Sequence, residues 1–193
     1  TQGVSSAASD VYKRQIYMLW RIFKTDKEKE LLMYRSHTDE LTGCFNRHAY
    51  EEDIVQLRMD EAFVYISLDM NGLKTVNDSL GHAAGDELIR GVASCMKQCF
   101  AEVGKVYRIG GDEFVIIVLD QMQNIENIRE TFDKTVRRWQ GKMVKEMSVS
   151  CGYVSSDEKE WDTNYDIAKA ADARMYENKA AYYQKSGRDR RKR

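Results

Sequence analysis

Apolar residues are grouped along this chain in short, sharply bounded runs. The run Phe63 to Leu68 is almost continuously apolar and ends abruptly at Asp69, which predicts a central strand covered on both faces. Two further runs, Val103 to Ile109 and Val115 to Leu119, flank paired glycines and predict a β-hairpin. In Met147 to Val154, apolar residues alternate with Ser and Gly, as in an antiparallel strand with one covered face.

Helical spacing of apolar residues predicts helices between these strands. The predicted strands and helices together indicate one α/β (α+β) domain with a palm-like architecture. In it, helices are expected to flank both faces of a mixed, mainly antiparallel sheet of about five strands. Thr25 to Arg35 alternates charged and apolar residues and is expected to form a connecting helix or a coiled-coil stalk. The domain helices are expected over residues 47–59, along an apolar stripe from 88 to 99, over 125–139, and over about 165–184.

The predicted hairpin turn carries two adjacent carboxylates, Asp112 and Glu113, directly after Gly110 and Gly111. Such carboxylates present hard oxygen ligands that suit Mg²⁺ or Mn²⁺. On its own, a turn of this kind is more often a solvated acidic loop. Asp69 argues against that interpretation, because a carboxylate at a central strand end, facing a carboxylate hairpin, is the geometry of palm-type metal sites.

A second group of polar residues follows Asp69. A glycine-containing turn after a strand, such as Asn71 to Lys74, exposes backbone N–H groups that can bind phosphates. Asn77, His82 and Asp86 come next, separated by glycines. Taken alone, these residues would be assigned as a turn asparagine and a helix N-cap aspartate.

Four segments, in order, carry a resemblance to a known family. They are DELTGCFNR at 39–47, DMNGLKTVNDSLGHAAGD at 69–86, RIGGDEF at 108–114 and ADARMYENK at 171–179. Together they resemble the diguanylate cyclase (GGDEF) domains, over most of the chain from Asp39 to about Lys179. The resemblance implies a nucleotidyl-cyclase fold that condenses two GTP into cyclic di-GMP and releases two pyrophosphates.

The resemblance also implies roles for individual residues. Asp69, the Met70 carbonyl, Asp112 and Glu113 are expected to hold Mg²⁺ or Mn²⁺. Asp112 or Glu113 is further expected to assist deprotonation of the ribose 3′-hydroxyl, and Arg108 to offset charge on the phosphates.

The substrate-binding residues follow in the same way. A carboxylate that accepts from guanine N1–H discriminates against adenine, which has no donor there. The resemblance therefore implies that Asn77 and Asp86 recognise the base, with His82 adjoining. Lys179 is expected on the terminal phosphates, although a helix lysine is normally just solvated. The remaining implied substrate-binding residues are Gly72, Leu73, Lys74, Gly110 and Gly111.

Departures from the family pattern leave an alternative open. Many relatives carry a second aspartate where Asn71 stands here, and an arginine where Tyr183 stands. A catalytically inactive domain that binds GTP or a cyclic dinucleotide and regulates a partner is the rival prediction. The intact hairpin motif favours the enzyme. For Asp39 and Arg47, a structural ion pair across the turn between them is favoured over a catalytic role.

Composition excludes some other functions. The 193-residue chain has a net charge of −1, so it has no strong field to recruit nucleic acid. Its four cysteines form no CxxC pair, and Cys95 and Cys99, one helical turn apart on an apolar stripe, are expected to be reduced core residues of a cytoplasmic domain. One domain supplies one metal cluster and one base pocket, so catalysis is expected to need a homodimer.

The two ends of the chain are expected to lie outside the catalytic domain. Residues 1–15 resemble a translated sequencing adapter and are expected to be non-native. Within residues 16–35, Ile16 to Phe23 fits either the cytoplasmic flank of a missing inner-membrane helix or an ordinary amphipathic helix, and an upstream sensor is expected to be missing. The domain is expected over 36–193, ending in a disordered basic tail at 188–193.

Overall fold

The computed structural model describes residues 2–119 and 124–185 and divides into two units, Thr1–His37 and Thr38–Arg193. The first unit is one helix, α1 (Gln2–His37), along which large apolar side chains such as Trp20 and Phe23 are exposed. No described helix is both long enough and apolar enough to cross a membrane. The predicted basic tail lies outside the described residues.

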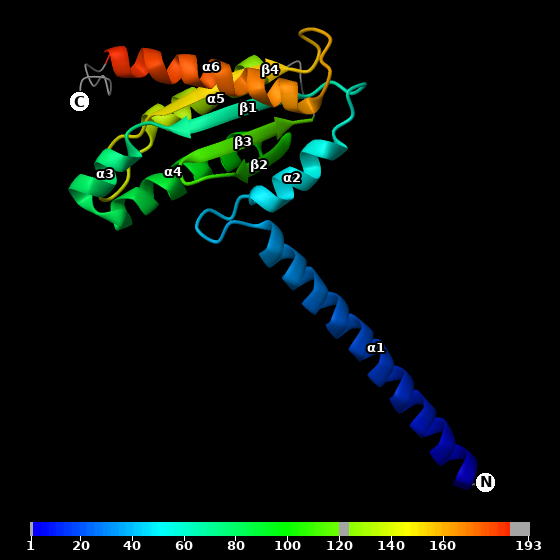
Figure 1. Ribbon diagram of the computed structural model, residues 1–193. Helices are drawn as coiled ribbons and strands as arrows, with labels where there is room; N and C mark the ends of the chain where they lie inside the picture. Colours follow the sequence, from blue (N-terminus) through cyan, green and yellow to red (C-terminus); the bar gives the residue numbers. More distant parts are fainter. Residues whose placement is uncertain (1, 120–123, 186–193) are drawn as a thin grey trace. The chain divides into compact units, whose positions relative to one another are not determined.

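The second unit is built on a sheet with the strand order β2-β3-β1-β4 (Figure 1). Its strands are β1 (Val64–Met70), β2 (Gly104–Arg108), β3 (Glu113–Val118) and β4 (Val149–Ser155), and every pairing is antiparallel. The predicted hairpin and central strand are confirmed. The prediction of about five strands in a mixed sheet is corrected, because the described residues form four. The parallel contact there is an isolated bridge between Phe45 and Tyr107, which cannot extend because Asn46 caps a helix.

Helices cover both faces of the sheet and create two cores. Alternate β1 residues point to opposite faces, so Ile66 packs with one set of helices and Tyr65 with the other. The first core lies under α4 (His82–Phe100) and α5 (Ile125–Arg138), and the second under α2 (Arg47–Gln56) and α6 (Asn164–Lys185) (Figure 1). All of β1 is buried, which agrees with its apolar sequence.

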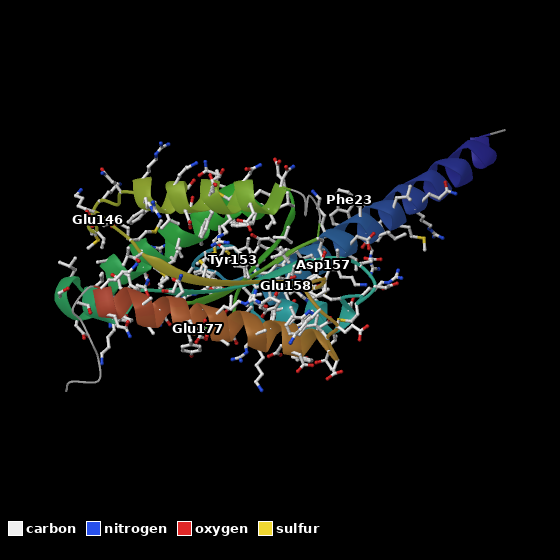
Figure 2. The ribbon with its side chains drawn as sticks, turned by 90° about the horizontal axis from the view of Figure 1, so that it is seen from above. Phe23, Glu146, Tyr153, Asp157, Glu158 and Glu177 are labelled. Atoms are coloured by element: carbon white, nitrogen blue, oxygen red, sulfur yellow. The ribbon has the colours of Figure 1, made fainter. Side chains whose placement is uncertain are left out.

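Side-chain contacts fix the ends of several helices. The Asn46 side chain accepts from the Ala49 N–H at 3.1 Å, so the predicted cap of α2 is confirmed, although the helix ends at Gln56. Arg174 of α6 donates to the Tyr153 carbonyl at 2.5 Å and pairs with Glu158 at 2.7 Å, and Figure 2 shows Tyr153 on β4 between α5 and α6. These bonds attach α6 to the edge of the sheet.

Candidate active site

The end of β1 and the β2–β3 hairpin meet through backbone pairing. Asp69 lies opposite Glu113 in the antiparallel register, and the Met70 N–H donates to the Asp112 carbonyl at 3.1 Å. The three acidic residues predicted from the sequence are therefore brought to one end of the sheet. Carboxylate oxygens gathered in this way, with the main-chain carbonyl of Met70 beside them, are a donor set that could hold Mg²⁺ or Mn²⁺.

Asp69 is the most enclosed of these acids, with 5% of its surface exposed. Burial raises its pKa, and the neighbouring charges of Asp112 and Glu113 raise it further, while the ammonium group of Lys179 lowers it. Lys179 Nζ lies 2.5 Å from Asp69 Oδ1. The structure thus brings the predicted phosphate-binding lysine directly to the predicted metal ligand, a contact that the sequence pattern did not predict.

The hairpin turn is tight at its paired glycines. The N–H groups of Ile109 and Gly110 both donate to the Glu113 carbonyl, at 3.0 and 3.3 Å. A Cβ at Gly110 would lie 2.7 Å from Glu113 Oε2, so a side chain there would displace this carboxylate. The glycine keeps space for Glu113 beside the turn.

Arg108 anchors the hairpin to the preceding segment of the domain. Its Nη1 lies 3.1 Å from both carboxylate oxygens of Asp39, and its Nη2 donates to the Gly111 carbonyl at 2.8 Å. The guanidinium group is thereby attached to the turn itself. Its expected action on phosphate charge stays a prediction.

This contact corrects the predicted ion pair between Asp39 and Arg47. Arg47 instead pairs with Glu51, one helical turn away on α2, at 3.2 Å. Burial would raise the pKa of Asp39, but hydrogen bonds from Thr42 and Arg108 outweigh it and hold that pKa below its ordinary value. Asp39 thus has a structural role, because it holds Arg108, which also bonds to the hairpin turn.

The segment predicted to bind phosphates, Asn71 to Lys74, contains a left-handed glycine. Gly72 has φ of 76°, a conformation that residues with a side chain rarely adopt, and it starts α3 (Leu73–Leu80). Leu73 is buried in the core, whereas Lys74 is exposed.

Asn71, the first residue of this segment, has contacts that explain the departure from the family pattern. Its Nδ2 donates to Ser148 Oγ and its Oδ1 accepts from Ser150 Oγ, each at 3.0 Å. An aspartate could not donate the first of these bonds. Asn71 therefore connects the end of β1 to β4, a role without a local sequence signal, because its partners lie far along the chain.

The predicted base-recognition residues lie at the corner between α3 and α4. Asn77 Oδ1 is buried and has no hydrogen-bond partner among the described residues. Gly85 faces it so closely that a Cβ there would lie 2.0 Å from that oxygen. His82 is exposed at the start of α4, and the half-exposed carboxylate of Asp86 lies 3.8 Å from Arg90. The corner therefore offers one buried acceptor and one accessible acceptor.

Comparison with known proteins gives the family. The protein-family model "Diguanylate cyclase, GGDEF domain" matches residues 36–185. This chain belongs to that family. The probable diguanylate cyclase DgcJ of Escherichia coli is 34% identical to it over 74% of this chain and 29% of its own length, and the diguanylate cyclase VdcA of Vibrio cholerae is 32% identical over 73% and 43%.

Other GGDEF relatives carry different names. The cyclic di-GMP phosphodiesterase PdeB of Shewanella oneidensis is 33% identical over 55% of this chain and 12% of its own length. The chain spans less than half the length of these curated relatives. Membership of the GGDEF family therefore establishes the domain and not the activity of a whole protein.

Solved GGDEF structures confirm the fold. The coiled coil and GGDEF domain of DgcB from Caulobacter crescentus, in complex with c-di-GMP, has a TM-score of 0.74 at 22% identity, covering 89% of this chain and 95% of that one. The GGDEF domain of TpbB from Pseudomonas aeruginosa has a TM-score of 0.65 at 27% identity, covering 75% and 90%.

Proposed function

We propose that this GGDEF domain is an active diguanylate cyclase that condenses two GTP into cyclic di-GMP and releases two pyrophosphates. The observation that carries the proposal is the meeting of Asp69 with Asp112 and Glu113 at one end of the sheet. The names of the relatives DgcJ and VdcA support it. An inactive regulatory domain would have no need to keep all three carboxylates together.

The residues at this end fit a hard divalent cation. Asp69, Asp112 and Glu113 offer anionic oxygens, and burial of Asp69 beside the other two makes a positive charge necessary there. Asp69, the Met70 carbonyl, Asp112 and Glu113 would hold Mg²⁺ or Mn²⁺. Such an ion would polarise the phosphate oxygens and favour the ionised form of a nearby hydroxyl.

The chain's own groups would select and orient the nucleotide. Buried Asn77 Oδ1 would accept from the guanine amino group, and Asp86 would accept from guanine N1–H, which adenine lacks. His82 would adjoin them. The phosphates would contact the backbone of Gly72, Leu73, Lys74, Gly110 and Gly111, and the ammonium group of Lys179.

The bond-forming step is a pair of displacements. The 3′-hydroxyl of each GTP loses its proton to Asp112 or Glu113 and attacks the α-phosphate of the other GTP, and pyrophosphate leaves. Because one domain offers one such site, two domains would have to face each other across a two-fold axis. Exposed apolar residues of α1, such as Leu32 and Met33, would help to pair two chains, as the coiled coil named for DgcB suggests.

The test is turnover measured against enzyme concentration. Purified protein is incubated with Mg²⁺ and GTP, the products are resolved by chromatography, and initial rates are measured over a wide dilution series. We expect cyclic di-GMP and pyrophosphate, with a rate that approaches the square of enzyme concentration at high dilution. GTP binding without any product would support the regulatory alternative. A strictly linear rate from a protein that light scattering shows to be monomeric would contradict the paired mechanism.

A further inference from the structure

Lys179 is paired with Asp69, the most enclosed carboxylate of the candidate metal site. The ion pair between Lys179 Nζ and Asp69 Oδ1 measures 2.5 Å, and its side chains are only 18% and 7% exposed. An ammonium group on this oxygen takes a lone pair that a metal ion would need. Its positive charge would also repel a divalent cation at short range, and shielding from water strengthens that repulsion. Lys179 and a metal ion therefore compete for Asp69.

The three carboxylates need a cation in this place even before a nucleotide binds. Asp69 is buried, and the nearby charges of Asp112 and Glu113 oppose its ionisation. A buried charge left without a partner is strongly destabilising, whereas a paired one is tolerated. Lys179 lies where it can supply the positive charge that a metal ion would otherwise have to supply.

The helix that carries Lys179 is itself attached to the sheet. Two helical turns earlier on α6, Asp172 Oδ1 accepts from the buried hydroxyl of Ser67 on β1 at 2.5 Å. Arg174 bonds to the Tyr153 carbonyl on β4. The α6 backbone thus stays in place while the flexible four-carbon side chain of Lys179 can change partners. A triphosphate bound beside Asp69 would offer the ammonium group a stronger anionic partner.

We propose that Lys179 is a built-in competitor of the metal ion, which holds Asp69 in the nucleotide-free domain and releases it when a triphosphate takes the ammonium group. This inference rests on the proposed function, because it assigns Asp69 to the metal and Lys179 to the phosphates. Its consequence is coupling: the domain binds a divalent cation weakly by itself and tightly with its nucleotide. By linkage, the cation must strengthen nucleotide binding by the same factor.

The experiment measures metal binding without turnover. Mn²⁺ is titrated into the nucleotide-free protein at about pH 8, where carboxylates are ionised, and free Mn²⁺ is counted by its electron paramagnetic resonance signal. We expect Lys179→Met to bind Mn²⁺ about fivefold or more tightly than the wild type, a typical size for coupling between sites. Lys179→Arg keeps the cation and should bind as weakly as the wild type.

Matched variants test whether the gain in Mn²⁺ affinity comes from the freed Asp69 oxygen or from net charge. Lys169→Met removes the same charge from an exposed position on α6, so it controls for net charge and should leave Mn²⁺ affinity unchanged. Asp69→Asn added to Lys179→Met should remove the gain, because the gained affinity belongs to that oxygen. Thermal unfolding checks that each variant is folded, and Lys179→Gln replaces Lys179→Met if the latter is not.

The outcomes separate this inference from the proposed reaction. Mn²⁺ binding by Lys179→Met that equals or falls below that of Lys169→Met would overturn the competition, as would a gain that survives Asp69→Asn. A gain in Mn²⁺ affinity together with wild-type protein that makes no cyclic di-GMP would support the competition and reject the cyclase. Wild-type protein that makes cyclic di-GMP, together with no gain in Mn²⁺ affinity in Lys179→Met, would support the cyclase and reject the competition.

Discussion

The two halves of the candidate site are constructed differently. At the sheet end, backbone pairing fixes the acids: Asp69 lies opposite Glu113, and the Met70 N–H holds the Asp112 carbonyl. At the helix corner, Asp86 projects half-exposed from α4, and a buried acceptor on Asn77 has no partner within the described chain. Under the proposed function, the acids of the first half are already positioned by the sheet, and the acceptors of the second half would be satisfied by hydrogen-bond donors that the substrate brings.

Under the proposed function, this difference separates catalysis from recognition. Groups that a sheet holds in position stabilise charge in the transition state without having to reorganise, so their loss should lower kcat. Groups that find their partners only on the substrate contribute to binding, so their loss should raise KM or weaken base selection. Mutations in the two halves should therefore give different kinetic signatures.

The largest effect is expected at the sheet end. Asp112→Ala should lower kcat by about 100-fold or more, since losing one preorganised charge-stabilising group typically costs that much. Its carbonyl bond to Met70 is made by the backbone and should survive, so the melting temperature should stay near that of the wild type. Steady-state pyrophosphate release provides the measurement.

Glu177→Ala is the matched control for charge. Glu177 is exposed on α6, as Figure 2 shows, and its loss should leave kcat almost unchanged. Product formation by Asp112→Ala at the wild-type rate would contradict the assignment of the sheet end to catalysis.

The next effect is expected at the helix corner. In Gly85→Ala the new methyl group would lie 2.0 Å from Asn77 Oδ1 and must displace that side chain. Losing one buried acceptor for the base should raise KM for GTP about tenfold while kcat changes little. Asn77→Ala should give the same increase, and the double variant should add nothing further, because both changes remove one interaction. Independent, additive effects would show that Gly85 does not act through Asn77.

A smaller effect is expected from the exposed partner in this corner. Asp86→Ala should reduce the preference for GTP over ATP about fivefold, less than for a fully buried acceptor, because water competes with its hydrogen bonds. Binding isotherms with non-reacting analogues of the two nucleotides measure this ratio. Arg90→Ala removes the cation 3.8 Å from Asp86 and should preserve the preference. An unchanged ratio in Asp86→Ala would mean that another group recognises the base.

The smallest effect concerns the support of the hairpin. Asp39→Asn weakens the pair with Arg108 and should lower the free energy of unfolding by about 1 kcal/mol near pH 7. The folded-state pKa of Asp39 is depressed, so its contribution is present above the unfolded-state pKa of about 4 and is lost as pH falls through the folded-state value.

Urea unfolding at several pH values tests the sign of this effect. The difference between wild type and Asp39→Asn should be largest near neutrality and should vanish in acid. Asp60→Asn, in an exposed pair with Arg58, should change stability little at any pH. A difference that grows as the pH falls would contradict the direction of the Asp39 shift.

Local sequence signals predicted the elements that position the site. The apolar run that stops at Asp69 and the paired glycines between apolar runs predicted β1 and the hairpin, because each signal is complete within a few residues. The last helix, predicted over about 165–184, is found at Asn164–Lys185 for the same reason. The resemblance to the family then assigned roles to positions that pattern alone left ambiguous.

Contacts between distant residues were not predictable in this way. Asp39 pairs with Arg108 rather than with the nearby Arg47, and Asn71 bonds to Ser148 and Ser150, because the folded sheet brings these groups together and no local period records it. The predicted number of strands differs from the observed number for a similar reason. Whether Phe45 forms a bridge or a strand depends on where Asn46 begins the next helix.

The central place of β1 has a consequence for protein synthesis. This strand carries Asp69, yet one of its two neighbours is β4, which ends at Ser155, and the lysine paired with Asp69 comes from α6. A ribosome must therefore release more than half of the domain after β1 before that strand can be enclosed. During translation the incomplete sheet exposes a hydrophobic strand edge, which is a hazard for aggregation. A nascent chain should thus acquire the Lys179–Asp69 pair only when the last helix has emerged.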